Sequence, residues 1–289
     1  MCLAREKTRE EGSSSPQRAP APGTGRRRGR PAAEDKGDVS RQTILRTALK
    51  LSKSVPLQDL SIVVVARSMG VTPALIHYYI GGRDWLTSGI MNLFYKSVFR
   101  KSPEISGDWE RDVHNAAKNL FDHLVTYPGI AAYLVSNHRF RIFQLTAFGD
   151  RDYGAEVLNR FAGLVRSAGL SAERMGLQTQ LIQEFVISTA HQATHDLLPA
   201  DHRQFFEEKL AALDPVRMEH IIFGKVTPLQ LNGESLFKEG ISLFLLGIER
   251  DRKIEGLAGA GKLASAKSKA ANSTAGKARS RGGKAGTAD

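Results

Sequence analysis

Apolar residues recur along the first predicted segment with the spacing of an amphipathic helix. Between residues 40 and 55, Ile44, Ala48, Leu51 and Val55 fall on one face, and Ser40 is placed to cap the helix at its start. The same three-to-four-residue period continues through most of the chain. No segment shows the strict apolar–polar alternation or the hairpin turns of a half-buried sheet. The pattern predicts an all-α fold.

Later helices are expected where this period returns between prolines and glycines. Pro128 and Pro199 are placed to end two of them, and Ser171 to cap the longest. Residues 223–235 are rich in turn-forming residues and predict a connection. The expected helical segments are 109–127, 129–140, 156–169, 171–198, 205–213 and 236–250.

Residues 56–86 carry the most specific pattern. A β-branched run, residues 62–65, would favour a strand by propensity alone. However, Ser61 is a good N-cap before this run, and Gly70 ends it at helical length. Thr72 and Pro73 then open a second short helix. Two short helices joined by a glycine turn are typical of a helix-turn-helix, whose second helix enters the major groove of DNA.

The stretch from Arg41 to Tyr95, which contains this segment, resembles the DNA-binding domain of the TetR (tetracycline-repressor type) family of bacterial regulators. Three positions depart from the family pattern: Arg83 stands where a lysine is usual, His77 where an aromatic is usual, and Leu75 where a threonine is usual. The resemblance implies an N-terminal three-helix DNA-binding domain and a C-terminal helical domain for ligand binding and dimerisation. Residues 236–250 look like the family's last, dimer-forming helix. The matching residues are Ser61, Val65, Ala66, Gly70, Val71, Thr72, Tyr79, Ile80 and Leu86.

The DNA contacts are expected at the start of each short helix and along the second one. Hydroxyl and backbone N–H groups at a helix N-terminus suit a phosphate, although for Ser61 a plain helix cap is an equal alternative. An arginine can clamp a phosphate with two hydrogen bonds. Leu75, Ile76 and Ile80 are assigned mostly to the core. The predicted DNA-binding residues of this region are Ser61, Thr72, Pro73, Ala74, His77, Tyr78, Tyr79 and Arg83.

Composition adds a second reason to expect nucleic acid. The 289 residues carry a net charge of +11, with a pI near 9.8, which favours nucleic acid first and an anionic membrane surface second. Residues 1–38 and the Ala/Lys-rich residues 253–289 predict disordered basic ends. The tail at 253–289 either binds phosphate weakly or is merely solvated. Between these ends we expect a DNA-binding domain at 39–100 and an effector-binding and dimerisation domain at 103–252.

The basic run RRRGRP gives the N-terminal arm a more specific prediction. Arg28 and Arg30 flank a glycine and resemble an AT-hook, in which arginines lie in a narrow A·T-rich minor groove. Nine residues separate Pro31 from Arg41, enough chain to reach an adjacent groove. The alternative is a purely electrostatic tether.

The cysteine count and hydropathy indicate the compartment. The lone cysteine, Cys2, excludes an intrachain disulfide. The start of the chain lacks the apolar core of a secretory signal, and no window of roughly 20 apolar residues could span a bilayer. We expect a cytoplasmic, nucleoid-associated protein with no membrane partner.

The resemblance also implies a buried pocket for a small effector in the second domain. For any single aromatic residue there, ordinary helix packing is the favoured interpretation. Arg139 and Arg141 could bind an anionic effector or be surface charges. His191 and His195 have metal-compatible spacing beside Asp196, but no third ligand is evident, so no metal or cofactor is expected. The predicted pocket residues are Tyr127, Tyr133, Phe140, Phe143, Glu184, His191 and His195.

Together these features predict a homodimeric transcription regulator, a repressor that binds a palindromic operator in double-stranded DNA and is released by a small-molecule effector. The alternative is a nucleoid-type architectural protein that binds DNA through its basic ends without an effector. An all-α enzyme using His191, His195 and Glu184 would lack a nucleophile–base pair, so no enzymatic activity is expected.

Overall fold

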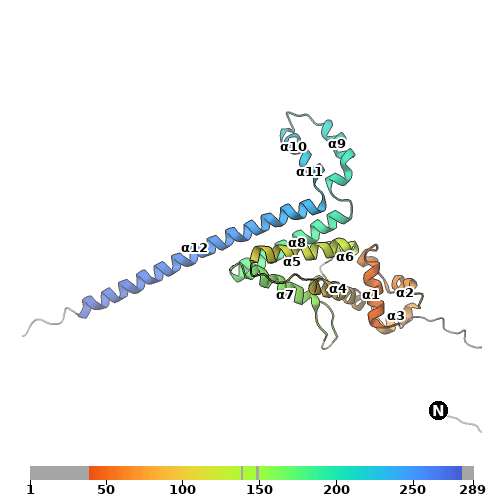
Figure 1. Cartoon of the computed structure of the whole chain (residues 1–289), viewed down its shortest axis with the longest axis horizontal. Coiled ribbons are helices and arrows are strands. Elements are labelled where there is room, and N and C mark those ends of the chain that lie inside the picture. Colours follow the sequence, from red (N-terminus) through yellow and green to blue (C-terminus); the bar gives the residue numbers. More distant parts are fainter. Residues whose placement is uncertain (1–38, 138, 148–149, 282–289) are drawn as a thin grey trace, which may run out of the picture. The chain divides into compact units, whose positions relative to one another are not determined.

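The computed structural model describes residues 39–137, 139–147 and 150–281, with side chains up to residue 257. In this part of the chain every regular element is a helix, which confirms the all-α prediction (Figure 1). No described helix combines the length and apolar character needed to cross a bilayer. The helices are α1 (Arg41–Leu51), α2 (Ile62–Met69), α3 (Pro73–Ile80), α4 (Arg83–Arg100), α5 (Trp109–Thr126), α6 (Pro128–Ser136), α7 (Tyr153–Arg166), α8 (Ala172–Thr194), α9 (Arg203–Ala211), α10 (Glu219–Gly224), α11 (Val226–Gln230) and α12 (Gly233–Arg281), with short 3-10 turns η1 (Leu57–Asp59) and η2 (Pro199–His202).

The first three helices, residues 39–82, form a small unit that we call the head. Ser40 caps α1, its hydroxyl oxygen accepting the N–H of Thr43 at 3.2 Å. Ser61 caps α2 in the same way through the N–H of Val64, also at 3.2 Å. The β-branched run is therefore helical: its cap and the left-handed Gly70 (φ 64°) outweigh the strand propensity.

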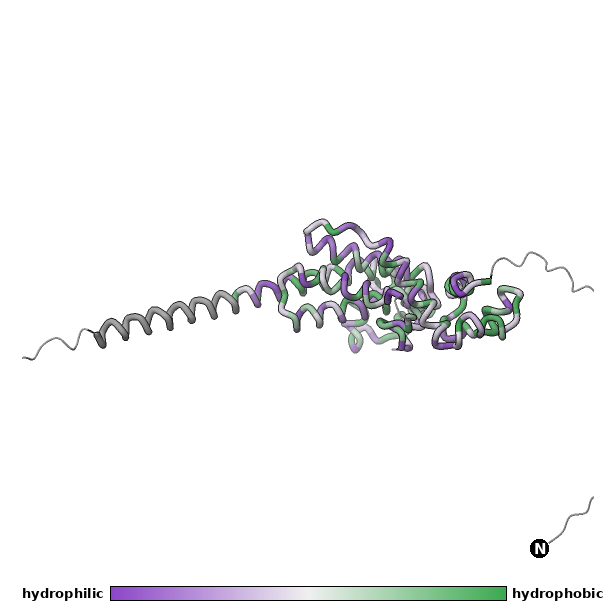
Figure 2. Tube along the Cα trace, turned by 90° about the horizontal axis from the view of Figure 1, so that it is seen from below, coloured by the Kyte–Doolittle hydropathy of each residue, from purple (hydrophilic) through white to green (hydrophobic). Residues whose placement is uncertain are grey.

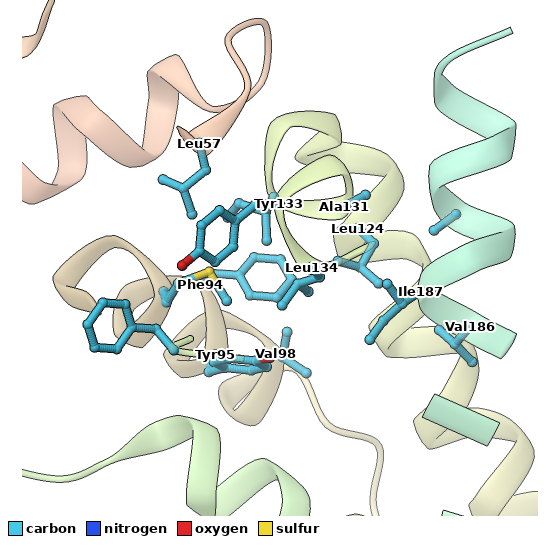
Figure 3. Packing of buried hydrophobic residues seen from close by; sticks show 14 of the residues in the cluster. Leu57, Phe94, Tyr95, Val98, Leu124, Ala131, Tyr133, Leu134, Val186 and Ile187 are labelled. Atoms are coloured by element: carbon cyan, nitrogen blue, oxygen red, sulfur yellow. The ribbon is translucent and has the colours of Figure 1, made fainter. Parts of the chain in front are cut away.

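The head is joined to the rest of the chain through α4 and α6. The first turn of α6 meets the end of α1, where the N–H of Gly129 donates to the carbonyl of Ser52 at 3.0 Å. A Cβ at Gly129 would lie 2.1 Å from the carbonyl oxygen of Val55, so this close approach requires glycine. Figure 3 shows Leu57 of the head near Tyr133 of α6. The described residues from Val39 onwards consequently group as one compact unit.

Helices α4 to α8 build the body around a continuous apolar core. Helix α8 packs against α5, α6, α7 and α12, and α4 packs against α7. Hydrophobic and hydrophilic residues are interspersed along the helical part of the chain (Figure 2), as expected for amphipathic helices. Phe94, Leu124, Leu134 and Val186 are fully or almost fully buried in this core (Figure 3).

Several helix boundaries differ from the sequence-based expectation. The helix expected at 129–140 ends at Ser136, and Phe140 adopts a left-handed conformation (φ 58°). The helix expected to reach Leu198 ends at Thr194, because Asp196 adopts a left-handed conformation (φ 51°) and the Thr194 hydroxyl donates to the carbonyl of Ala190 at 2.8 Å. The expected turn-rich connection 223–235 contains α11. Helix α12 continues through residues 253–281, where a disordered tail was expected. Alanine, lysine and arginine have high helix propensity, and here they extend a helix that is already formed.

Candidate nucleic-acid interface and internal cavity

Helix α3 presents one face to solvent and the other to the head's core. Its start is set locally: the Thr72 hydroxyl oxygen accepts the N–H of Leu75 at 3.4 Å, and Pro73 takes the first helical position. Ile76 and Ile80 are buried and Leu75 is half-buried, as predicted. The predicted base- and phosphate-facing residues of this helix are all exposed: Thr72, Pro73, Ala74, His77, Tyr78 and Tyr79.

Two tyrosines dominate the exposed face of α3. The Tyr78 side chain is 81% exposed, and its ring meets the Tyr79 ring edge to face at 5.3 Å between centroids. Large aromatic side chains held this far out of the core gain little from folding. They are well placed to contact a partner, with a hydroxyl that can donate to a phosphate or a base edge.

The other two predicted DNA contacts, Ser61 in the head and Arg83 at the start of α4, have structural roles as well. The Ser61 oxygen is occupied by the cap of α2, while its hydroxyl hydrogen stays available to an acceptor. Arg83 begins α4, and its guanidinium donates to the carbonyl of Gln58 in η1. This bond holds the side chain beside the head, and its other N–H groups remain for a phosphate. Arg28 and Arg30, the predicted minor-groove contacts, lie outside the described residues.

Two of the smaller cavities lie in the body, among α4, α5, α7 and α8, and are partly open to solvent. One measures about 30 Å³ and the other about 40 Å³, and both have Leu120, Val157 and Gln183 in their walls. The first is also lined by Tyr95, Leu134, Arg141, Ile142, Gly154, Leu158 and Ile187. The second is also lined by Val98, Ser102, Pro103, Glu104, Ile105, Asp112, Ala116, Asn119, Arg160, Phe161 and Leu164.

The charged group of the first cavity is Arg141. Its side chain is 12% exposed, and one guanidinium nitrogen, Nη2, lies 2.6 Å from the Glu184 carboxylate. The same nitrogen has no aligned hydrogen-bond acceptor among the described residues, so the contact is a charge pair with poor hydrogen-bond geometry. The buried Tyr95 hydroxyl donates to the backbone carbonyl of Arg141, and burial raises the pKa of this tyrosine.

Arg141 belongs to a segment that we call the strap, residues 139–146, which joins α6 towards α7. The Tyr133 hydroxyl donates to the carbonyl of Arg139 at 2.8 Å, and the Leu145 N–H donates to the Ser88 hydroxyl at 2.6 Å. The side-chain amide of Gln144 donates to the carbonyls of Phe140 and Ile142, at 2.8 and 3.2 Å. The strap is therefore positioned by side chains of α4 and α6 and by its own glutamine.

The structure does not gather the predicted pocket residues around these cavities. Tyr127 packs edge to face on Phe94, and Tyr133 is buried beside the strap. Within the strap, Phe140 is buried and Phe143 is 68% exposed. Glu184 approaches the first cavity through its pair with Arg141. None of the seven predicted residues is in either cavity wall. Tyr127, Tyr133 and Phe140 contribute to packing, and the predicted pocket stays a prediction.

The two predicted histidines lie together on α8, away from the cavity walls. The rings of His191 and His195 are 4.2 Å apart, and burial, followed by the nearby His195, lowers the pKa of His191. In the portion of the chain covered by the structure, no three His, Cys, Asp or Glu side chains gather as a metal site would require.

Sequence reasoning missed most of the cavity wall. Tyr95, Gln183 and Ile187 look like ordinary core positions in the sequence, because they follow the helical period of α4 and α8. Arg139 and Arg141 flank Phe140 in the sequence, and that pattern suits an anion ligand and surface charges equally. The structure leaves the Arg139 side chain exposed and largely buries that of Arg141.

Comparison with known proteins connects this architecture to a class of regulators. No protein-family model matches the sequence, and no match was found among curated proteins. Among solved structures, ActR from Streptomyces coelicolor is similar, with a TM-score of 0.63, 18% identity, and coverage of 76% of this chain and 99% of that chain. The TetR family protein ActR in complex with (S)-DNPA is similar at 0.59 and 20% identity, covering 74% and 98%.

A third structure extends the same likeness. The transcriptional regulator SCO7222, a TetR from Streptomyces coelicolor, is similar with a TM-score of 0.57 and 18% identity, covering 74% of this chain and all of that chain. The chain therefore has the all-α fold of TetR-type transcription regulators, with an N-terminal helix-turn-helix followed by a helical body.

Proposed function

We propose that this chain is a TetR-type transcription regulator that binds DNA as a homodimer and responds to a small molecule. We further propose that it is a repressor, that its operator is palindromic, and that the effector releases it from DNA. The observation that carries the proposal is helix α3, which is capped at its start and keeps Thr72, Ala74, His77 and Tyr78 exposed on one face. This is the geometry of a helix that enters a major groove.

The proposed dimer uses the outer faces of α8 and α12. Leu177 and Leu181 on α8 are 45% and 42% exposed, and Leu243 and Leu246 on α12 are 69% and 66% exposed. The two helices pack against each other within the chain. A second copy would cover these leucines in a four-helix bundle and would place two heads on the successive half-sites of a palindrome.

The proposed effector site is the region of the two internal cavities. They lie between the head-bearing helix α4 and the dimer helix α8, so a molecule that enlarges them changes contacts with both. Such a molecule weakens DNA binding if it favours a dimer whose heads no longer match the operator spacing. Nothing in this arrangement requires a catalytic step, and we propose no enzymatic role.

The experiment that tests this function is selection of bound fragments from genomic DNA, followed by footprinting of the full-length protein. A discrete, two-fold symmetric protected site supports the regulator. Uniform protection along the DNA would instead support the architectural alternative, in which the basic ends bind without sequence preference.

A truncation tests the part assigned to the N-terminal arm. Deleting residues 1–31 should lower operator affinity and relax the preference for A·T-rich flanks, because Arg28 and Arg30 are proposed to lie in the minor groove. Lower affinity with an unchanged flank preference would reduce the arm to an electrostatic tether.

A further inference from the structure

The cavity beside Arg141 is built to receive a negative charge. A guanidinium that is 12% exposed has lost most of its hydration, and this cost must be offset by an anion and by hydrogen bonds. Glu184 supplies the charge, but Nη2 of Arg141 has no aligned acceptor within the described part of the chain. A carboxylate with both oxygens in the plane of the guanidinium would satisfy it better.

Glu184 can leave this pair at low cost. Its side chain is 47% exposed, and it already accepts a hydrogen bond from Gln180 on the same helix at 2.6 Å. A carboxylate that turns towards water regains its hydration, whereas Arg141 cannot follow it outwards without leaving the strap. The two partners are therefore unequal: Arg141 stays in place, and Glu184 is the exchangeable counter-ion.

The remaining wall of this cavity defines the other part of the ligand. It is mainly apolar, with Gln183 and the Tyr95 hydroxyl as polar exceptions, and Figure 3 shows Tyr95, Leu134 and Ile187 among the core residues. An acid group facing Arg141 and an apolar body facing these side chains describe an anionic amphiphile. The apolar wall residues are Leu120, Leu134, Ile142, Val157, Leu158 and Ile187.

Cavities of about 30 and 40 Å³ have room for only a few water molecules, so the ligand-bound conformation must be more open. Leu120, Val157 and Gln183 separate the two cavities and come from α5, α7 and α8. Moving these three side chains joins the cavities into one site. The ligand then has a different affinity for the closed and the open conformation, which is the requirement for coupling.

The strap connects this site to the head. Phe140, between the two arginines, has a left-handed backbone (φ 58°) that is unusual for a non-glycine residue. On one side of it Arg141 pairs with Glu184 of α8. On the other side Arg139 pairs with Asp84 in the first turn of α4 at 2.7 Å, next to the proposed phosphate ligand Arg83.

We propose that the effector is an amphiphile whose carboxylate replaces Glu184 on Arg141, and that the strap passes this exchange to the head through the Arg139–Asp84 pair. The proposal rests on the proposed function for its effector site. Its ligand class and its link to the head can be measured without DNA, so its failure is distinguishable from failure of DNA binding.

Calorimetric titration of the full-length protein with sodium octanoate, and with octan-1-ol as the uncharged comparison, tests the ligand class. We expect octanoate to bind at least about tenfold more tightly than octan-1-ol. Arg141→Met should remove this charge preference. Glu184→Gln should tighten octanoate binding several-fold and leave octan-1-ol unchanged, because it removes the competing carboxylate.

Matched controls come from another ion pair of the body. Arg151 and Glu156 form an exposed ion pair at the start of α7, with 2.7 Å between their charged atoms. The variants Arg151→Met and Glu156→Gln each remove one charge of this pair. Both should keep the parent protein's preference for octanoate over octan-1-ol. Thermal unfolding confirms that each variant is folded. Any of four results overturns the ligand assignment. In the parent protein these are equal binding of the two probes or no binding of octanoate. In the variants they are a retained charge preference in Arg141→Met or weaker octanoate binding in Glu184→Gln.

Hydrogen exchange tests the link to the head. Saturating octanoate should change the amide exchange of residues 72–86 at least about twofold in the parent protein, since these residues adjoin the Arg139–Asp84 pair. Asp84→Asn should bind octanoate with the same affinity and lose this response. Unchanged exchange in the parent protein, or an equal response in Asp84→Asn, overturns the role of the strap.

Discussion

Helix α3 and the strap are both short segments with functional side chains, yet they are held in opposite ways. The start of α3 is set within a few residues by Thr72 and Pro73, and its exposed face has few contacts inside the protein. The strap has no regular structure, and its position depends on Tyr95, Ser88 and Tyr133 from α4 and α6.

This difference follows from where each proposed ligand lies. A DNA-reading surface must stay open to solvent, so local signals alone have to shape it. A site inside the body must hold a cation such as Arg141 at low hydration, which needs many simultaneous contacts. Substitutions should therefore cost stability in the strap region and cost DNA affinity in the head.

The largest stability effect is expected where α7 meets the strap. A Cβ at Gly154 would lie 2.0 Å from the carbonyl oxygen of Ile142, so Gly154→Ala forces the strap away and should destabilise the protein by about 3 kcal/mol. Urea denaturation measures this free energy of unfolding. Gly163→Ala, in the same helix with no atom within 4 Å of an added Cβ, should instead be neutral or slightly stabilising. Equal effects at both positions would contradict the close contact.

Replacing tyrosine by phenylalanine next to the strap and on α3 should give the next largest difference in the free energy of unfolding. Tyr95→Phe removes the hydroxyl that donates to the Arg141 carbonyl and leaves a part-buried acceptor unpaired, which should cost about 1.5 kcal/mol. Tyr78→Phe removes a solvent-exposed hydroxyl and should change the free energy of unfolding by less than about 0.5 kcal/mol. If the two variants unfold alike in urea, the strap is not held through Tyr95.

A smaller effect is expected on DNA affinity from the head. Arg83→Ala should weaken operator binding about fivefold and lower the slope of log affinity against log salt by about 1, because one phosphate contact is lost. Fluorescence anisotropy over a salt series measures both quantities. Arg203→Ala is the matched control, since that guanidinium also donates to a backbone carbonyl, that of Leu229, and lies in α9. An unchanged salt slope in Arg83→Ala would remove this residue from the DNA contacts.

The smallest expected effect is on the pH dependence of the free energy of unfolding, and it compares a histidine of the body with one of the head. Burial lowers the pKa of His123, whose ring nitrogens lie 2.7 Å from the Asn119 carbonyl oxygen and 3.1 Å from the Ser97 hydroxyl. The unfolded chain then binds the proton more readily than the folded one. The stability that neutral His123 contributes to the folded protein is therefore fully present above about pH 6.5. It is lost as the pH falls through the lowered pKa.

His123→Gln should therefore flatten the decrease in the free energy of unfolding between pH 7.5 and 5.5. Urea denaturation at a series of pH values measures this decrease. His77→Gln, on the exposed face of α3, is the control for the loss of one imidazole. An unaltered slope in His123→Gln would show that this histidine is not the group responsible.

The amino-acid sequence alone determined much of the fold and of the surface that we propose faces DNA. The caps at Ser40, Ser61 and Thr72 and the glycine turn at Gly70 act over three or four residues, so their effect is legible from neighbouring positions. Burial of Ile76 and Ile80 follows from helical period in the same way, and this leaves the opposite face of α3 exposed.

Only the tertiary structure determines which residues come together around Arg141. Arg141 forms an ion pair with Glu184, 43 residues later in the sequence, and its backbone carbonyl accepts a hydrogen bond from Tyr95, 46 residues earlier. Gly154 lies close to the Ile142 carbonyl of the strap. Tyr127, one of the predicted pocket aromatics, packs on Phe94. An aromatic residue in a helical sequence carries no sign of whether its ring faces a cavity. Contacts between distant segments depend on how whole helices pack, which local periodicity does not encode.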